Sequence, residues 1–249
     1  MKPTTLGILG GLGPMSGVYF CEMLIRHTKA ERDQEHLNFL LSSRADTPDR
    51  TAYIVGDSRE DPVPVMKREV EKLAAAGADL IAIPCNTAHY FYDAVSTATP
   101  VPILNIIEAT AAYCAARGFS SVGVLATEGT IASGSYKQAL DAHGIEYLIP
   151  SKADQGIIGD MIYRDIKQGK DPDPTEFFRI CDTLFCRGAK TVILGCTELS
   201  LLKRSFGLGE DYTDSLEVLA LSALRLCGKE PVGFDPALLS FTPPTPIHT

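Results

Sequence analysis

The chain has no surplus of basic residues and no long apolar run. Its 249 residues include 23 lysines and arginines against 31 aspartates and glutamates, a formal net charge of −8. Proteins that bind a nucleic-acid backbone need a basic surface, so we expect no nucleic-acid partner. No apolar stretch approaches the length of about 18 residues that a membrane-spanning helix requires, so we expect no membrane partner either.

The sequence also lacks a paired-cysteine motif. Its seven cysteines, an odd number, include no C-x-x-C. This pattern favours free thiols over a disulfide framework or a zinc site. The first residues, Met1–Thr5, lead into a strand-like segment and do not have the layout of a signal peptide. We therefore expect a cytoplasmic protein.

Short apolar segments alternate with amphipathic ones along the chain. Six segments rich in Ile, Leu and Val lack strict alternation of polar and apolar residues, as strands covered on both faces do. They are Thr5–Gly10, Leu37–Ser42, Asp79–Pro84, Ser121–Ala126, Ile145–Pro150 and Lys190–Gly195. Between them the apolar residues follow a helical period, as Met66, Val70 and Leu73 do. The alternation predicts an α/β fold with parallel sheets between helices.

The two halves of the chain resemble each other. Each opens with a glycine-containing strand, GILGGLGPMSG or GVLATEGTIASG, and each later has a strand that ends in a cysteine, LIAIPC or TVILGC. We therefore expect two similar α/β domains. The first is 1–101 plus 212–230, because an apolar helix after residue 214 could return to it, and the second is 102–211. The C-terminal tail is 231–249, and its last part, Phe241–Thr249, which contains three prolines, is expected to be loosely held.

The first glycine turn does not fit a dinucleotide-binding site. The fingerprint G-x-G-x-x-G, started at Gly11, requires glycine where Ser16 stands, and no acidic residue follows at the usual distance. Pro14 instead suits the first position of a helix. Backbone N–H groups at this turn could approach a ligand carboxylate, which makes Gly11 a candidate substrate-binding residue.

Two cysteines stand in matching positions. Cys85 and Cys196 each follow an apolar strand and precede a helix start, with polar neighbours on the C-terminal side. Open α/β sheets bind ligands at the carboxyl ends of their strands. A helix N-terminus also lowers the pKa of a nearby thiol, so we expect both thiols to face a cleft and to ionise readily.

Other chemistries have weaker support. His89 lies four residues after Cys85, on the same face of a helix, and we favour a packing role over a Cys–His pair. The spacing of Cys85, His89 and Cys196 does not match a metal site, so no metal is expected. No local signature of a pyridoxal-binding lysine occurs, so we expect no cofactor.

The motifs GILGGLGP, TPDRT, PCNTAHYFYD, ATEGT and GCTEL together resemble the aspartate/glutamate racemase family of cofactor-independent amino-acid racemases. The resemblance extends from about Gly7 to Cys227. It implies two Rossmann-like domains related by a pseudo-twofold axis, with the active site between them and one catalytic cysteine from each. The matching catalytic positions are Cys85 and Cys196.

The same resemblance implies a set of substrate-binding residues. They are Arg50 and Thr51 in TPDRT, Asn86 and Thr87 after the first cysteine, Thr127 in ATEGT, Thr197 and Glu198 after the second cysteine, and Lys167 near the end of IIGDMIYRDIK. The implied reaction inverts an acidic amino acid, aspartate or glutamate. One thiol removes the α-proton on one face and the other thiol delivers a proton on the opposite face. A small amino-acid substrate is the expected partner, and a homodimer is an open alternative to a monomer.

The chain departs from the family pattern at positions that bear on the substrate. Glu198 stands where the related cell-wall glutamate racemases have histidine, and Leu12 stands where many relatives have methionine. The segment 43–46 matches neither group clearly. Hydantoin racemases and maleate isomerases share the scaffold and remain alternatives. Arylmalonate decarboxylases keep only one of the two cysteines, so the pair argues against them.

One alternative is not an enzyme. A two-lobed binding protein or redox sensor could use the same two thiols, which would oxidise to a disulfide that locks the lobes.

Overall fold

The computed structural model describes residues 4–246 and contains two four-stranded sheets. The first sheet is formed by β1 (Thr5–Gly10), β2 (Asn38–Ser43), β3 (Leu80–Ala82) and β4 (Ile103–Leu104). The second is formed by β5 (Ser121–Leu125), β6 (Glu146–Leu148), β7 (Val192–Leu194) and β8 (Tyr212–Asp214). Neighbouring strands within each sheet are parallel, in the orders β2-β1-β3-β4 and β6-β5-β7-β8. The two halves therefore repeat one topology, and the predicted α/β class with two similar parallel sheets is confirmed.

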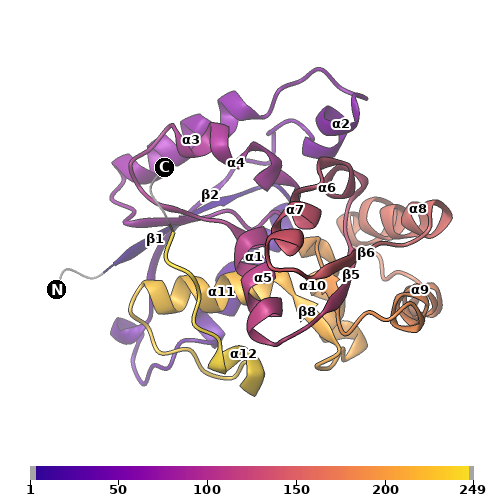
Figure 1. Cartoon of the computed structure of the whole chain (residues 1–249). Helices are drawn as coiled ribbons and strands as arrows, with labels where there is room; N and C mark the ends of the chain where they lie inside the picture. The colour runs from indigo at the N-terminus through magenta and orange to yellow at the C-terminus, as the bar shows by residue number, and fades with distance from the viewer. Residues whose placement is uncertain (1–3, 247–249) are drawn as a thin grey trace.

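The helices surround both sheets (Figure 1). The α-helices are α1 (Pro14–Arg26), α2 (Arg50–Val55), α3 (Val63–Ala75), α4 (Tyr92–Ser96), α5 (Ile106–Ala116), α6 (Glu128–Ser133), α7 (Ser135–Ala142), α8 (Lys152–Asp160), α9 (Pro174–Cys186), α10 (Thr197–Phe206), α11 (Ser215–Leu226) and α12 (Pro236–Ser240). Three short 3₁₀ helices, η1 (Asp33–Glu35), η2 (Thr87–Phe91) and η4 (Ile166–Gln168), and a π-helix, η3 (Met161–Asp165), complete the set. None of the helices between residues 4 and 246 has the length and hydrophobicity needed to cross a bilayer.

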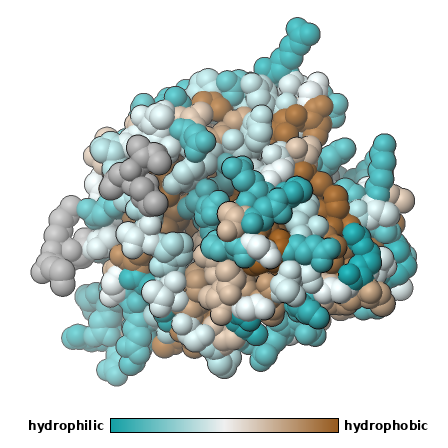
Figure 2. All heavy atoms as spheres, viewed as in Figure 1, coloured by the Kyte–Doolittle hydropathy of each residue, from teal (hydrophilic) through white to brown (hydrophobic). Residues whose placement is uncertain are grey.

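Burial explains why these segments form strands and helices. Every residue of β3, β5 and β7 is buried, as expected for inner strands of covered parallel sheets. The edge strand β2 is partly exposed. In α3 the predicted apolar face, Met66, Val70 and Leu73, is buried as well. Figure 2 shows the outer surface on one side, where hydrophobic residues occur in separate groups among hydrophilic ones.

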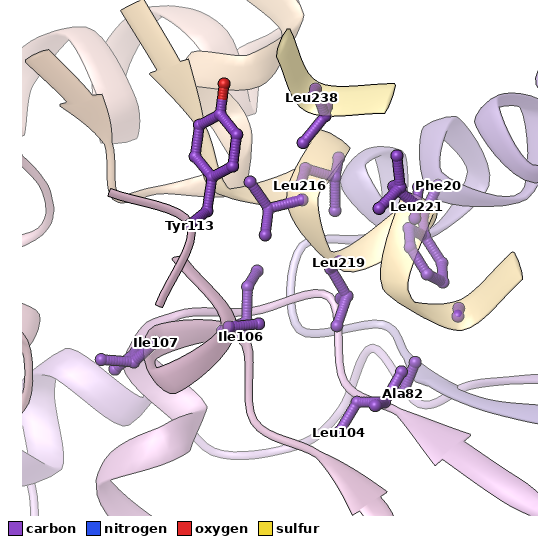
Figure 3. Packing of buried hydrophobic residues seen from close by; sticks show 14 of the residues in the cluster. Phe20, Ala82, Leu104, Ile106, Ile107, Tyr113, Leu216, Leu219, Leu221 and Leu238 are labelled. Atoms are coloured by element: carbon purple, nitrogen blue, oxygen red, sulfur yellow. The ribbon is translucent and has the colours of Figure 1, made fainter. Parts of the chain in front are cut away.

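Helix α11 connects the two halves through the main hydrophobic core. It follows directly on β8 and packs against α1 and α5. In Figure 3, Leu216 and Leu219 of α11 lie beside Ile106 of α5, and all three residues are fully buried. The predicted first domain includes residues 212–230 and therefore β8. In the structure β8 pairs with β7, a strand of the second sheet. The division into domains otherwise stays a prediction.

The expectation of a loosely held tail is wrong at Phe241, the first residue of that segment. Phe241 is buried and its ring meets the ring of Tyr113 edge-on, with centroids 5.4 Å apart. The guanidinium of Arg225 donates hydrogen bonds to the carbonyls of Leu239 and Phe241. Aromatic burial and satisfied backbone carbonyls therefore hold this segment against α11 in spite of its prolines. The last predicted tail residues, 247–249, lie outside the described residues.

Candidate active site

The two cysteines predicted to be catalytic line one cavity. Cys85 follows β3 and precedes the short helix η2, and its N–H donates a hydrogen bond to the carbonyl of Ile83 at 2.7 Å. Cys196 follows β7 and is the N-cap of α10. Because β3 and β7 occupy equivalent places in the two sheets, the repeat delivers one thiol from each half. Both residues are buried, with 6% and 4% of their surfaces exposed.

The cavity contains every predicted site residue except Gly11. Its lining residues are Leu12, Asp49, Arg50, Thr51, Cys85, Asn86, Thr87, Thr127, Tyr163, Lys167, Cys196, Thr197 and Glu198. Its free volume is about 10 Å³. That volume is close to the minimum that one water molecule needs. The cavity is therefore too small for an amino acid, which can bind only to a more open form of the protein.

A chain of polar contacts runs from the second thiol to a lysine. The Sγ–H of Cys196 donates to Oε2 of Glu198 at 3.0 Å, and Oε1 of Glu198 lies 3.2 Å from Nζ of Lys167. Burial and the charge of Glu198 raise the pKa of Cys196 well above its usual value, although Lys167 acts in the opposite direction. The expectation that a helix end makes this thiol ionise readily is therefore wrong. The backbone effect of one helix N-terminus is smaller than desolvation plus an adjacent carboxylate.

Lys167 carries a stable positive charge in the cavity. Burial alone would lower its pKa, but Glu198 and the two thiols, Cys196 and Cys85, raise it above the usual value of a lysine. The ammonium of Lys167 therefore interacts electrostatically with both thiols. Tyr163 flanks it, with the ammonium 5.1 Å from the ring centroid, a distance that permits a cation–π interaction.

Arg50 is buried and held by the backbone. Its guanidinium donates hydrogen bonds to the carbonyls of Leu12 at 2.7 Å, Pro48 at 3.0 Å and Thr47 at 3.2 Å. Within residues 4–246 no carboxylate pairs with it, and its Nε has no hydrogen-bond partner. The carbonyls fix the orientation of the side chain but leave its charge uncompensated. The result is a preorganised binding group for an anion.

Three threonine hydroxyls join the two halves of the cavity. Oγ1 of Thr87 lies 2.9 Å from Oγ1 of both Thr127 and Thr130, and the last two are 3.0 Å apart. The backbone N–H of Thr130 also donates to Thr127, which caps α6. Sequence reasoning found Thr87 and Thr127 but missed Thr130, whose place one helical turn after Thr127 was the available signal.

Thr51 is brought to the same region by close packing. A Cβ on Gly129 would lie 2.8 Å from the Cα of Thr51, so only glycine permits α2 and α6 to approach this closely. Oγ1 of Thr51 is buried and has no hydrogen-bond partner in the described part of the chain. It is therefore available to a ligand.

Asn86 and Thr197 mainly bind protein groups. The amide of Asn86 accepts a hydrogen bond from the Tyr136 hydroxyl at 2.7 Å and donates one to Oγ of Ser215 at 3.0 Å. The hydroxyl of Thr197 donates to the carbonyl of Pro84 at 3.3 Å. These contacts cross between the halves and place the segments that carry the two cysteines.

Gly11 does not line the cavity. Its φ of +84° is in the left-handed region, and a Cβ there would come within 2.2 Å of the backbone nitrogen of Arg44. The glycine is required by the turn and by the approach of the segment after β2. The structure thus gives it a place beside the site and not in its wall.

His89 takes the packing position that the sequence favoured. The ring is buried, with Nδ1 at 2.9 Å from the Cys85 carbonyl, while Nε2 accepts from the N–H of Ile106 at 3.2 Å and also lies 3.2 Å from the Leu104 carbonyl. This pattern fits the neutral ring with the proton on Nδ1. Burial lowers the pKa of His89, so the neutral form is also the favoured one.

Sequence reasoning named Leu12 only as a departure from the family pattern that bears on the substrate, and it missed two residues of the cavity wall, Asp49 and Tyr163. Leu12 and Asp49 stand next to predicted residues, and Asp49 caps α2 by accepting the N–H of Ala52 at 2.8 Å. Tyr163 is on the π-helix η3, where the helical register changes. Burial raises the pKa of this tyrosine to about 12, so its hydroxyl keeps its proton.

Comparison with known proteins gives a consistent result. The family model described as Asp/Glu/Hydantoin racemase matches residues 9–221. The broad specificity amino-acid racemase RacX of Bacillus subtilis is 30% identical over 229 residues, which cover 88% of this chain and 96% of that protein. A glutamate racemase of Aquifex aeolicus is 31% identical over 170 residues, 66% of this chain and 65% of that protein. Among solved structures, the Picrophilus torridus aspartate racemase superposes with a TM-score of 0.79 at 29% identity, covering 92% of this chain and 96% of that one.

Proposed function

Because this chain belongs to the Asp/Glu/Hydantoin racemase family, it is an isomerase, and we propose that it racemises aspartate or glutamate by a cofactor-independent mechanism with two cysteine bases. The observation that carries the proposal is the cavity itself. Two thiols from equivalent strands meet there with two cationic side chains, Arg50 and Lys167. A stereocentre between the thiols can lose a proton to one and gain a proton from the other.

The resting protonation of the thiols gives each a starting role. The Sγ–H of Cys196 is bonded to Glu198, and its pKa is raised by burial and by that carboxylate, so Cys196 starts as the proton donor. In this mechanism Cys85 is then the base that removes the α-proton of one enantiomer. After one turnover Cys85 carries the proton and Cys196 is the thiolate, which is the form that accepts the other enantiomer.

The cations account for a dicarboxylic substrate. Removal of the α-proton moves negative charge onto the α-carboxylate, and donors around it lower the barrier. Thr51 and the threonine cluster Thr87–Thr127–Thr130 offer hydroxyl groups on one side of the cavity. Arg50 offers an uncompensated guanidinium for the distal carboxylate. A substrate bound there would share Lys167 with Glu198.

Replacement of each cysteine by serine tests the mechanism. We expect Cys85→Ser and Cys196→Ser to lose racemisation of L- and D-aspartate and glutamate, followed by chiral chromatography. In heavy water each variant should still exchange the α-proton of one enantiomer, and the two variants should differ in which one. The matched control is Cys186→Ser, at an exposed cysteine that does not line the cavity, and it should behave as the wild type. Full racemisation by either active-site variant would contradict the two-thiol mechanism.

A broader substrate range is the second candidate. The relative from Bacillus subtilis is a broad specificity racemase, and Leu12 puts an apolar side chain into the cavity wall. Neutral amino acids would make no use of the Arg50 charge. We also propose a cytoplasmic location, since all seven cysteines are unpaired thiols of the kind that a reducing compartment preserves.

A further inference from the structure

A second, larger cavity lies outside the active site. It has a volume of about 270 Å³ and is enclosed by the end of α10, by β8, by the first turn of α11 and by the segment that leads into α12. It shares no lining residue with the cysteine cavity. Its size approaches the range of about 300–1,000 Å³ that small-molecule sites occupy.

The charges in this cavity do not balance. Asp214 and Glu217 both line it, and Lys203 forms an ion pair with Oε2 of Glu217 at 2.6 Å. Asp214 is buried, with 3% of its surface exposed. Its Oδ1 accepts hydrogen bonds from Ser200 at 2.6 Å and, as the N-cap of α11, from the N–H of Leu216 at 2.8 Å. Its Oδ2 has no hydrogen-bond partner in the described chain. An unpartnered buried carboxylate oxygen is costly, and such a group indicates an absent partner.

The raised pKa values of the two carboxyl groups also indicate that this cavity has too little positive charge. Burial raises the pKa of Asp214, although Lys203 opposes this. Burial and the neighbouring Asp214 raise the pKa of Glu217 to about 7 in spite of its ion pair. Two cations, Lys203 and Arg117, face four acids in the cavity lining: Asp214, Glu217, Glu210 and Asp235. A further cation with hydrogen-bond donors would stabilise the carboxylates of Asp214 and Glu217.

The walls of the cavity favour an organic cation over a bare ion. Phe234, Leu238 and Val218 are buried around it, and Figure 3 shows Leu238 near the hydroxyl end of Tyr113, another lining residue. Apolar surface of this kind binds carbon, and the aromatic faces also attract ammonium groups. Among the described residues, no group of three or more histidine, cysteine or acidic side chains is placed to hold a metal ion.

We propose that this cavity binds a small organic ammonium ion. Its ammonium group donates hydrogen bonds to Asp214 and Glu217, and its apolar part packs against Phe234 and Leu238. Two connections lead from this site to the catalytic cavity. Helix α10 carries Ser200 and Lys203 and begins at Cys196, and Ser215, next to Asp214, holds the amide of Asn86. A bound ammonium ion would thus contact elements that position both cysteines.

The test compares an amine with a neutral molecule of the same shape. Calorimetric titration at about pH 8, where Glu217 is ionised, would use 2-phenylethylamine and 2-phenylethanol on the whole protein. Neither probe is an amino acid, so binding is measured independently of racemisation. We expect the amine to bind at least tenfold more tightly than the alcohol. Equal binding of the two probes, or binding of neither at millimolar concentration, would overturn the proposal.

Variants and chemical shifts locate the binding. Glu217→Gln and Asp214→Asn should each weaken amine binding at least tenfold, whereas the control Glu146→Gln, at an exposed glutamate on β6, should leave it unchanged. Thermal unfolding would establish that each variant is folded. If only one of the two variants folds, its amine affinity alone can be compared with that of the wild type. Methyl resonances of Val218 and Leu238 should shift on binding. Unchanged affinity in a folded Glu217→Gln or Asp214→Asn, or shifts confined to the cysteine cavity, would refute the assignment.

Discussion

Replacement of Glu198 by glutamine should turn Cys196 into a more readily ionised thiol. In the structure the carboxylate accepts the Sγ–H of Cys196, and it is one of the two main causes, with burial, of the raised pKa of that thiol. Glutamine has nearly the same shape and can still accept the hydrogen bond through its amide oxygen. The substitution therefore removes a charge while it keeps the packing. The thiolate form of Cys196 should become more populated at neutral pH.

The size of the effect follows from the distance. Sγ of Cys196 and Oε2 of Glu198 are 3.0 Å apart. Two unit charges at that separation repel by about 5 kcal/mol at an effective dielectric constant of about 20. The substitution removes this repulsion, and Lys167 then attracts the thiolate without a competing carboxylate. Even a quarter of this energy corresponds to about a tenfold change in an equilibrium constant.

Alkylation by iodoacetamide measures the thiolate fraction, because the thiolate is the reacting form. Mass spectrometry of the cysteine peptides should show Cys196 labelled at least tenfold faster in Glu198→Gln than in the wild type near pH 7. Cys85 lines the same cavity, so its labelling in the same sample reports any change in access. The control Glu128→Gln replaces an exposed glutamate in the first turn of α6 and should change neither rate. An unchanged rate at Cys196 in Glu198→Gln would refute the role given to this carboxylate.

Two further predictions concern Arg50 and His89. Arg50→Ala should lower kcat/KM for aspartate and glutamate by at least a hundredfold, because it removes the unpaired cation. Activity on neutral amino acids should fall far less. An equal loss on both substrate classes, measured by chiral chromatography, would show that Arg50 does not select acidic substrates. Burial holds the pKa of His89 in the folded state below its usual value of 6.5, so below about pH 6.5 the unfolded chain binds more protons than the folded one. Stability therefore decreases as the pH is lowered through this range, by up to about 1.4 kcal/mol per pH unit. Urea unfolding of His89→Gln should lack this component, and an identical pH profile in variant and wild type would contradict the buried neutral ring.

The sequence predicted the strands that lie within longer runs of apolar residues. All six predicted segments overlap strands of the structure. The two that were missed, β4 and β8, have two and three residues. Ile103–Leu104 follows a proline-containing turn, and Tyr212–Asp214 is largely polar in sequence. Strands this short are specified by pairing with a neighbour, which no local pattern can show.

The cavity that holds both cysteines was accessible to sequence reasoning because of its position in the fold. Cys85 and Cys196 end equivalent strands, and parallel strands bring their carboxyl ends to one edge of a sheet. The protonation of Cys196 was not accessible in the same way. It depends on the distance to Glu198 and on complete burial, which are properties of the packed structure. The place of Gly11 was likewise decided by a neighbouring segment, at Arg44, that is distant in sequence.

Substrate entry must break contacts between the two halves, since the cavity of about 10 Å³ has no room for an amino acid. The hydroxyl contacts that cross the cavity are those of Thr87 with Thr127 and Thr130, both at 2.9 Å, and that of Thr197 with the Pro84 carbonyl at 3.3 Å. A net worth of about 1 kcal/mol for each gives an opening cost of about 3 kcal/mol, which leaves an open form of somewhat under about 1 per cent before substrate arrives. The hydrogen bond from Asn86 to Ser215 can stay intact during opening. Ser215 is on α11, which packs into the main core and can remain fixed while the other half moves. The threonine cluster therefore has two tasks: it closes the cavity around the thiols, and it has to yield its hydroxyls to the substrate that opens it.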